Sequence, residues 1–151
     1  KEAVPRISRM AVLWNPANPG AARALRETEA AARSLGVQPQ SLEVRGLSDL
    51  ESAFSALRKD RTVALIVLPD PMLHGYRKRI VDLAAKNRLP AMYYVRDWVE
   101  AGGLMAYGAS FPDLYRRAAV FVDKIVRGTR PRDLPVEQAT KFITVVNIKT
   151  A

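Results

Sequence analysis

The sequence has no cysteine and a single histidine, His74, among its 151 residues. Without cysteine the chain has no disulfide, no thiolate nucleophile and no zinc–thiolate site. One histidine also argues against a histidine-based metal site and against a catalytic triad. We therefore expect neither a metal nor a cofactor, and we interpret His74 as a loop or capping residue rather than as a ligand group.

Long apolar runs are missing as well. The longest, at residues 63–69, reads Val-Ala-Leu-Ile-Val-Leu-Pro, far short of the roughly 20 residues of a membrane-spanning helix. The first five residues, Lys-Glu-Ala-Val-Pro, lack the apolar segment of a signal peptide. Because the chain begins without methionine, this says little about the parent protein. The remaining composition, 48% hydrophobic and 26% charged, is typical of a globular domain.

Positive charge is plentiful, since 24 Lys and Arg against 15 Asp and Glu give a formal charge of +9. Such an excess is found in proteins that bind nucleic acid. Here the basic residues are scattered and are not interleaved with aromatic residues. The densest run, Arg77-Lys78-Arg79, lies at the predicted start of a helix, where a solvated face explains it. We expect no nucleic-acid partner, and an orienting contact with an acidic partner is the alternative.

Apolar runs of strand length alternate with helical patterns up to about residue 95, which predicts an α/β fold with a parallel sheet. Right-handed crossovers favour an open three-layer, Rossmann-like sheet in the flavodoxin-like order 2-1-3-4. The third strand is apolar on both faces and should be central, whereas the second alternates and should be an edge. Ser48 and Glu51 have the spacing of a helix capping box. The four strands are predicted at residues 10–14, 41–44, 64–68 and 91–95.

The pattern changes after residue 95. A short helix at 96–101 is interrupted by two glycines, and a strand follows at 104–108. A strongly amphipathic helix is predicted at 112–127, with Gly128 at its end. A proline-rich linker at 129–139 then leads to a final strand at 142–148. The apolar stripe of the long helix consists of Leu114, Ala118, Phe121, Val122 and Ile125.

In an open α/β sheet, ligands bind beyond the carboxyl ends of the strands, where the strand order reverses. In the predicted order this point lies between the loops at residues 15–20 and 69–72. The first loop leads into a helix N-terminus, which favours an anionic group such as a carboxylate. Asn15 and Asn18 add polar groups, Asp70 adds a carboxylate, and Trp14 offers a stacking surface. Turn formation, capping and core packing explain these residues as well as ligand binding does, so both interpretations stay open.

Enzyme motifs are absent. The sequence contains no G-x-G-x-x-G after the first strand, no G-K-[ST] phosphate loop and no G-x-S-x-G elbow. Asp70 lies where a response-regulator receiver has its phosphoacceptor, but the first strand ends in Trp14-Asn15-Pro16 rather than in acidic residues. One carboxylate holds Mg²⁺ poorly. We therefore expect no catalytic residues and no enzyme activity.

Several motifs together carry a resemblance to a known family. They are Met10–Pro19, Leu42–Arg45, Leu65–Pro71, Val99–Gly108 and Leu134–Gln138. In these segments the chain resembles the uncharacterised ABC transporter substrate-binding proteins related to the tryptophan-binding receptor. The resemblance implies a type I periplasmic binding protein fold, which has two α/β lobes, three crossings between them and a ligand cleft at the hinge.

The resemblance also implies a division of the chain. Residues 1–110 would form the second, C-terminal ligand-binding lobe, and residues 111–128 a helix that returns toward a first lobe. Residues 129–151 would form a linker and a final strand that crosses back. Carried over by position, the ligand-binding residues lie in the loops after the strands: Trp14, Asn15, Asn18, Asp70, Pro71, Arg96, Asp97, Ala109 and Ser110.

By the same resemblance, the chain is part of the solute-binding component of a bacterial ABC importer, which binds an amino acid or similar small molecule. Its partners would be that ligand and the permease subunits in the membrane. Its location would be the periplasm, or outside the cytoplasm on a lipid anchor. The ligand-sensing domain of a transcription regulator, which uses the same two-lobed fold, is the alternative. We also expect self-association of this piece through the helix at 112–127.

Overall fold

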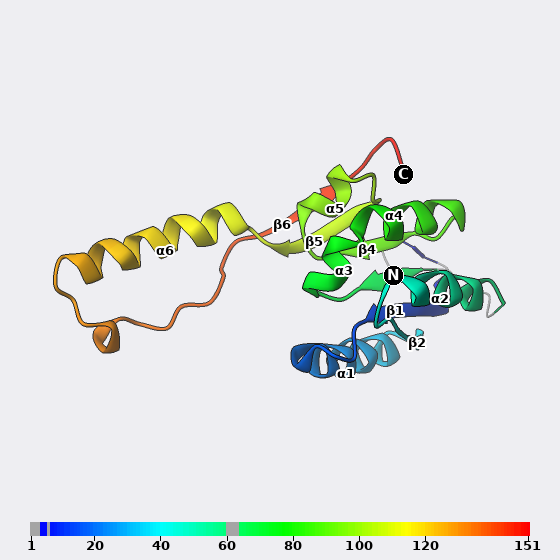
Figure 1. Ribbon diagram of the computed structural model, residues 1–151, viewed down its shortest axis with the longest axis horizontal. Helices are drawn as coiled ribbons and strands as arrows, with labels where there is room; N and C mark the ends of the chain where they lie inside the picture. Colours follow the sequence, from blue (N-terminus) through cyan, green and yellow to red (C-terminus); the bar gives the residue numbers. More distant parts are fainter. Residues whose placement is uncertain (1–3, 6, 60–63) are drawn as a thin grey trace.

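A six-stranded sheet in the order β2-β1-β3-β4-β5-β6 organises the chain (Figure 1). The computed structural model describes residues 4–5, 7–59 and 64–151; residues 1–3 and 63, named above, lie outside this part. The strands are β1 (Arg9–Trp14), β2 (Gln38–Glu43), β3 (Leu65–Val67), β4 (Ala91–Tyr93), β5 (Met105–Ala109) and β6 (Phe142–Val146). The helices are α1 (Pro19–Ser34), α2 (Leu47–Lys59), α3 (Pro71–Gly75), α4 (Arg77–Lys86), α5 (Arg96–Glu100), α6 (Phe111–Val126) and the 3₁₀ helix η1 (Pro131–Asp133).

The predicted strand order is confirmed. Strands β1 to β4 are parallel, β3 lies between β1 and β4, and β2 is an edge strand bonded to β1. Strand β5 continues the parallel set, and β6 runs antiparallel beside it. All parallel strands therefore end at the same edge of the sheet, which is where a ligand site was expected.

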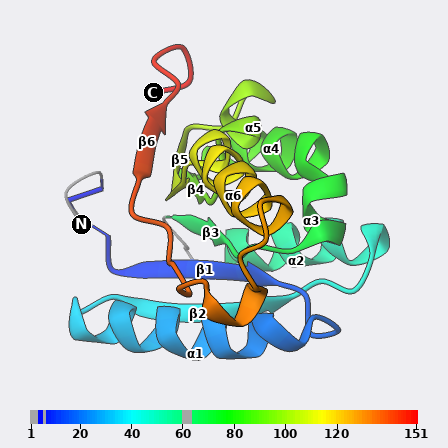
Figure 2. The ribbon, with the colours of Figure 1, turned by 90° about the vertical axis from the view of Figure 1, so that its left-hand side faces the viewer.

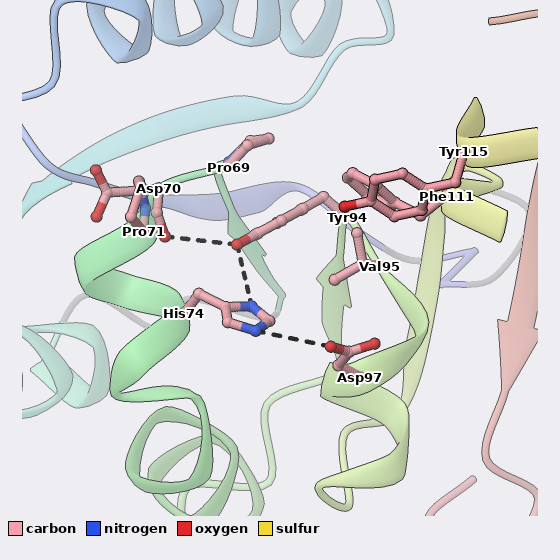
Figure 3. Close-up of a pocket in the computed structure, with 9 residues that line it drawn as sticks. All are labelled: Pro69, Asp70, Pro71, His74, Tyr94, Val95, Asp97, Phe111 and Tyr115. Carbon is pink, nitrogen blue, oxygen red and sulfur yellow. Dashed lines mark hydrogen bonds and ion pairs between the residues drawn. The ribbon is translucent and has the colours of Figure 1, made fainter. Parts of the chain in front are cut away.

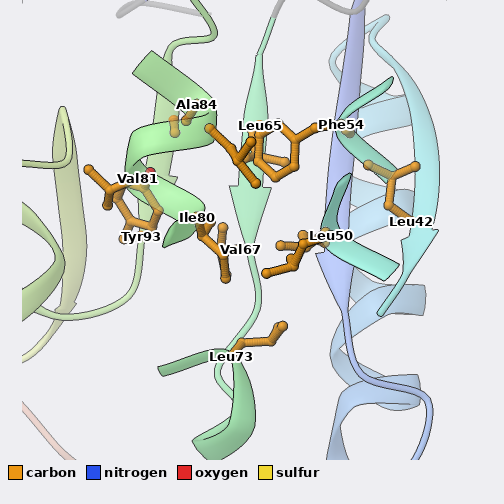
Figure 4. Packing of buried hydrophobic residues seen from close by; sticks show 14 of the residues in the cluster. Leu42, Leu50, Phe54, Leu65, Val67, Leu73, Ile80, Val81, Ala84 and Tyr93 are labelled. Carbon is orange, nitrogen blue, oxygen red and sulfur yellow. The ribbon is translucent and has the colours of Figure 1, made fainter. Parts of the chain in front are cut away.

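Helix α1 covers one face of the sheet, and α2, α4 and α5 cover the other (Figure 2). The pleat of β1 explains the two cores, because successive side chains point to opposite faces. Met10, Val12 and Trp14 belong to the α1 side, whereas Ala11 and Leu13 belong to the other side. Figure 4 shows part of that second, larger core, whose members from β3, α2 and α4 meet around Leu65. Each large side chain buried in this way contributes about 1.5–3 kcal/mol.

Two local expectations were wrong. Helix α2 begins at Leu47, so Ser48 is inside the helix and does not form the capping box with Glu51. A turn at Gly46, closed by the Asp49 N–H, starts the helix early, and the Asp49 carboxylate accepts the Arg45 N–H at 2.8 Å. In α1, apolar spacing also predicts that Leu35 shares the buried face with Ala21 and Leu25, but Leu35 is 55% exposed, because the helix ends at Ser34.

Two glycines allow neighbouring parts of the chain to pack closely against the end of β4. A Cβ on Gly108 would collide with the Tyr94 carbonyl oxygen, and one on Gly103 would lie 2.6 Å from a carbon of the Tyr93 ring. Both approaches require a residue without a side chain. These two glycines hold the end of β4 and the strand β5 in contact, next to the expected ligand edge.

Helix α6 projects away from the rest of the molecule (Figure 1). None of its residues is buried, and of the predicted stripe only Leu114 and Phe121 are half-buried. The chain then returns through η1 to β6, which pairs with β5 (Figure 2). In the described part of the chain, no helix is long and apolar enough to cross a membrane.

Candidate functional site

Asn15, Asn18 and Asp70 meet at the carboxyl ends of β1 and β3, and we call them the Asp70 cluster. Both amide groups donate to Asp70 Oδ2, from Asn15 Nδ2 at 3.1 Å and from Asn18 Nδ2 at 2.9 Å. The other oxygen, Oδ1, accepts the Leu73 N–H at 2.8 Å and so caps α3. Asp70 is only 4% exposed. The three residues that the sequence predicted to lie at one edge of the sheet are therefore close together, and they are hydrogen-bonded to one another.

The amide oxygens of Asn15 and Asn18 also accept hydrogen bonds from the protein's own backbone. Asn15 Oδ1 accepts the Ala17 N–H at 2.9 Å, and Asn18 Oδ1 accepts the Gly20 N–H at 3.0 Å. Side chains of the protein therefore occupy the N-termini of both α1 and α3. The anionic ligand group expected at the start of α1 would compete with these caps.

Trp14 lies in the core rather than at a surface. It is 9% exposed, it packs with the α1 side, and its Nε1 donates to Ser41 Oγ at 2.8 Å. The side chain therefore ties β1 to β2. A role of Trp14 in ligand stacking stays a prediction that requires this packing to open.

Beside the Asp70 cluster is an open cavity of about 630 Å³, which we call the aromatic cavity (Figure 3). Its walls come from the end of β3, from α3, from the segment between β4 and α5, and from the first turn of α6. A volume of this size is typical of small-molecule sites. The lining residues are Pro69, Asp70, Pro71, His74, Tyr94, Val95, Asp97, Phe111 and Tyr115.

A short polar network crosses the cavity wall. The Tyr94 hydroxyl lies 3.4 Å from the Asp70 carbonyl oxygen and 3.3 Å from His74 Nδ1. On the other side of the imidazole, His74 Nε2 lies 3.7 Å from Asp97 Oδ2. Burial is the main cause that raises the pKa of Tyr94. A tyrosine is protonated at neutral pH in any case, and this shift keeps the Tyr94 hydroxyl a hydrogen-bond donor at higher pH as well.

Aromatic rings form a second part of the cavity surface. Phe111 and Tyr115, one turn apart on α6, have ring centroids 6.3 Å apart at a tilt of 40°. On the opposite wall, the His74 ring packs edge-on against the ring of Trp98, which is fully buried behind it, with centroids 6.0 Å apart. A flat or apolar ligand would contact aromatic rings from two segments of the chain, one before and one after β5.

The other expected site residues occupy different positions. Pro71 and Asp97 line the cavity, whereas Arg96 Nε is bonded to Glu100 Oε1 at 2.8 Å, along the surface of α5. Ala109 ends β5, and the adjoining Ser110 is buried with its N–H bonded to the Lys141 carbonyl. These last two lie where the chain passes from the sheet into α6.

Outside the loops expected to bind a ligand, sequence reasoning missed five residues of the cavity: His74, Tyr94, Val95, Phe111 and Tyr115. His74 was interpreted as a loop or cap residue, although it lies one helical turn after Asp70 and must face the same side. Tyr94 follows β4 directly, which marks it as a residue of the ligand edge. For Phe111 and Tyr115 the sequence held no such signal, because their place depends on the direction in which α6 leaves the sheet.

The arrangement of polar and apolar groups around the cavity suits the binding of a small molecule. In the described ranges, no group of three or more His, Asp or Glu side chains could hold a metal ion. The polar side chains of the cavity are two carboxylates, an imidazole and two phenols, set among proline, valine and phenylalanine side chains. A few polar groups on an apolar surface are typical of a ligand-binding pocket.

Comparison with known proteins gives a consistent result. The family model for ABC transporter substrate binding proteins matches residues 1–151, while no curated protein matches the chain. A conserved domain protein from Vibrio cholerae superposes with a TM-score of 0.86 at 20% identity, over 98% of this chain and 50% of that chain. An ABC domain in complex with L-Trp, from Streptococcus pneumoniae, superposes with a TM-score of 0.84 at 19% identity, over 97% and 51%.

A third structure is a ligand-free, open substrate-binding protein with adhesive properties from Clostridium difficile, with a TM-score of 0.76 at 18% identity, over 97% of this chain and 49% of that chain. At these identities the similarity shows the fold, which is the α/β lobe of type I periplasmic binding proteins. The chain spans about half the length of each of these structures. Since the family model covers the whole chain, the protein belongs to the ABC transporter substrate-binding protein family.

Proposed function

We propose that the chain forms one lobe and the hinge crossings of the solute-binding component of a bacterial ABC importer. In this proposal residues 1–110 are the second lobe, residues 111–128 form a helix that belongs against a first lobe, and residues 129–151 cross back. The exposed apolar side chains of α6 and the coverage of about half of each similar structure support this division. The receptor would work outside the cytoplasm, as a partner of membrane permease subunits.

The aromatic cavity is the observation that carries the proposal. It lies at the carboxyl ends of β3 and β4, where open α/β sheets bind ligands. One wall belongs to the lobe, through His74 and Tyr94, and the other to the first turn of α6, through Phe111 and Tyr115. A ligand between these walls would contact both sides of the hinge, so its binding would favour a closed arrangement over an open one.

The mechanism is binding without covalent chemistry. A ligand shifts the balance between open and closed states only by the difference in its affinity for the two. Contacts that exist only when the walls approach each other supply this difference, and the permease would recognise the closed state. The family assignment favours this function over the ligand-sensing domain of a transcription regulator.

The test is the identification of a bound small molecule. The full-length receptor, purified without denaturation and then unfolded, should release a compound that mass spectrometry detects. Calorimetry with that compound should show saturable binding. Tyr115→Ala should weaken it, since Tyr115 is 71% exposed and its truncation spares the core, whereas Tyr107→Ala, on an exposed tyrosine outside the cavity, should not. Absence of any released or added small-molecule ligand would contradict the proposal.

A further inference from the structure

The charge of the aromatic cavity is opposite to that of the chain. The protein has 24 Lys and Arg against 15 Asp and Glu. None of the nine residues that the structure places around the cavity is Lys or Arg, and two of them are Asp. The described wall therefore attracts positive rather than negative ligand groups.

Only one of the two carboxylates is available to a ligand. The oxygens of Asp70 already accept three hydrogen bonds, from Leu73, Asn15 and Asn18. The Asp97 side chain is 61% exposed, and its contact with His74 Nε2, at 3.7 Å, is too long for a hydrogen bond. Both Asp97 oxygens can therefore accept hydrogen bonds from a ligand.

Two arginines adjacent to the cavity are engaged with other partners. The Arg96 guanidinium pairs with Glu100 on the surface of α5. The Arg77 guanidinium donates to the His74 carbonyl oxygen at 3.3 Å. Within the described part of the chain, neither of these two guanidinium groups pairs with Asp97.

The rings around Asp97 suit the same kind of ligand. Tyr94, Phe111 and Tyr115 line the cavity with it, and Figure 3 shows Asp97 facing His74 across from these rings. Aromatic faces attract cations through their quadrupole, most strongly when water is excluded. A carboxylate combined with several rings recognises a positively charged nitrogen that is attached to an apolar or aromatic body.

Building on the proposed receptor function, we infer that the ligand is an organic cation. Its protonated amine or quaternary ammonium nitrogen faces Asp97, and its apolar body packs against Tyr94, Phe111 and Tyr115. A protonated amine would donate a charge-assisted hydrogen bond to Asp97, which is the strong kind, whereas a quaternary ammonium would be held by charge and by the aromatic rings alone. This lobe therefore selects for positive charge on the ligand, and any contact with a negatively charged group comes from elsewhere in the receptor.

Three probes with the same phenyl body separate charge from shape: phenylethylamine, phenylethanol and phenylpropionate. Calorimetry on the full-length receptor should give the tightest binding for the amine, by at least about tenfold, the equivalent of one charged hydrogen bond. Asp97→Asn keeps the size of the side chain and should abolish this preference. Asp82→Asn removes an exposed carboxylate that pairs with Lys78 on α4 and should preserve it.

The outcomes are distinct for the two proposals. Tighter binding of phenylpropionate, or an amine preference that survives in Asp97→Asn, overturns the organic-cation inference while the receptor function stands. If no probe binds, the compound released from the purified receptor decides: one with a positively charged nitrogen supports the inference, and one without it refutes it. A receptor that binds no small molecule at all refutes both.

Discussion

Replacement of Asp70 should destabilise the fold rather than only weaken ligand binding. The sequence left ligand binding and helix capping open as roles of Asp70 and Asn15. The structure shows that Asp70 is buried and accepts three hydrogen bonds, one of which caps α3. An alanine at this position leaves the Leu73 N–H and the Asn15 amide without their acceptor.

The expected loss follows from these contacts. An N-cap contributes about 1 kcal/mol, and an unsatisfied donor on the buried Asn15 costs about 1–3 kcal/mol. Asn18 is half-exposed and can turn to water, so it adds little. Asp70→Ala should therefore lower the free energy of unfolding by roughly 2–4 kcal/mol. Asp70→Asn should cost nearly as much, because its amide group would face the amide donors of Asn15 and Asn18.

Urea unfolding followed by far-UV circular dichroism measures this loss. In a double-mutant cycle, Asn15→Ala should cost less in the Asp70→Ala background than in the native one, because the shared hydrogen bond is already absent. Asp123→Ala is the matched control, since it removes an exposed aspartate that pairs with Arg127 on α6. Such a pair contributes at most about 1 kcal/mol. If Asp70→Ala unfolds at the same urea concentration as the control, the structural role of the cluster is refuted.

Three further perturbations test other parts of the fold. Gly108→Ala should destabilise by at least about 1–3 kcal/mol through overpacking against the Tyr94 carbonyl, whereas Gly75→Ala, with open space around it, should be neutral in the same urea experiment. Tyr93→Phe should stabilise by about 1 kcal/mol, because the buried Tyr93 hydroxyl has no partner among the described residues. Burial also raises the pKa of Tyr93, so the free energy of unfolding should fall as the pH rises through about 10, where an unfolded tyrosine ionises. Tyr93→Phe should weaken that fall, and the same loss of stability at alkaline pH in both proteins would contradict this. Val122→Glu should reduce self-association in light scattering without lowering stability, since Val122 is exposed on α6; a native chain that stays monomeric at high concentration would refute the expected association.

The fold could be predicted because its determinants are local and repetitive. The apolar run of β3, covered on both faces, marked it as central, and the alternation in β2 marked it as an edge. Crossover connections between parallel strands are right-handed, which leaves few possible strand orders, and the observed order is one of them. The start of α2 could not be predicted in the same way, because Gly46 and Ser48 are both acceptable helix boundaries and the Arg45–Asp49 contact decided between them.

The place of the candidate site also follows from the sequence, because parallel strands of known order must end at one edge, and the aromatic cavity lies at that edge. The role of each side chain could not be predicted, because it depends on which partners the folded chain brings within hydrogen-bond distance. Asp70 could face a ligand or cap a helix, and the approach of Asn15 and Asn18 turned it inward. His74, Tyr94, Phe111 and Tyr115 come from α3, the end of β4 and α6, and only the direction in which α6 leaves β5 puts them around one cavity. Local sequence pattern thus determined the sheet and the edge at which its parallel strands end. Long-range contacts between segments that share no periodicity decided which residues line the cavity at that edge.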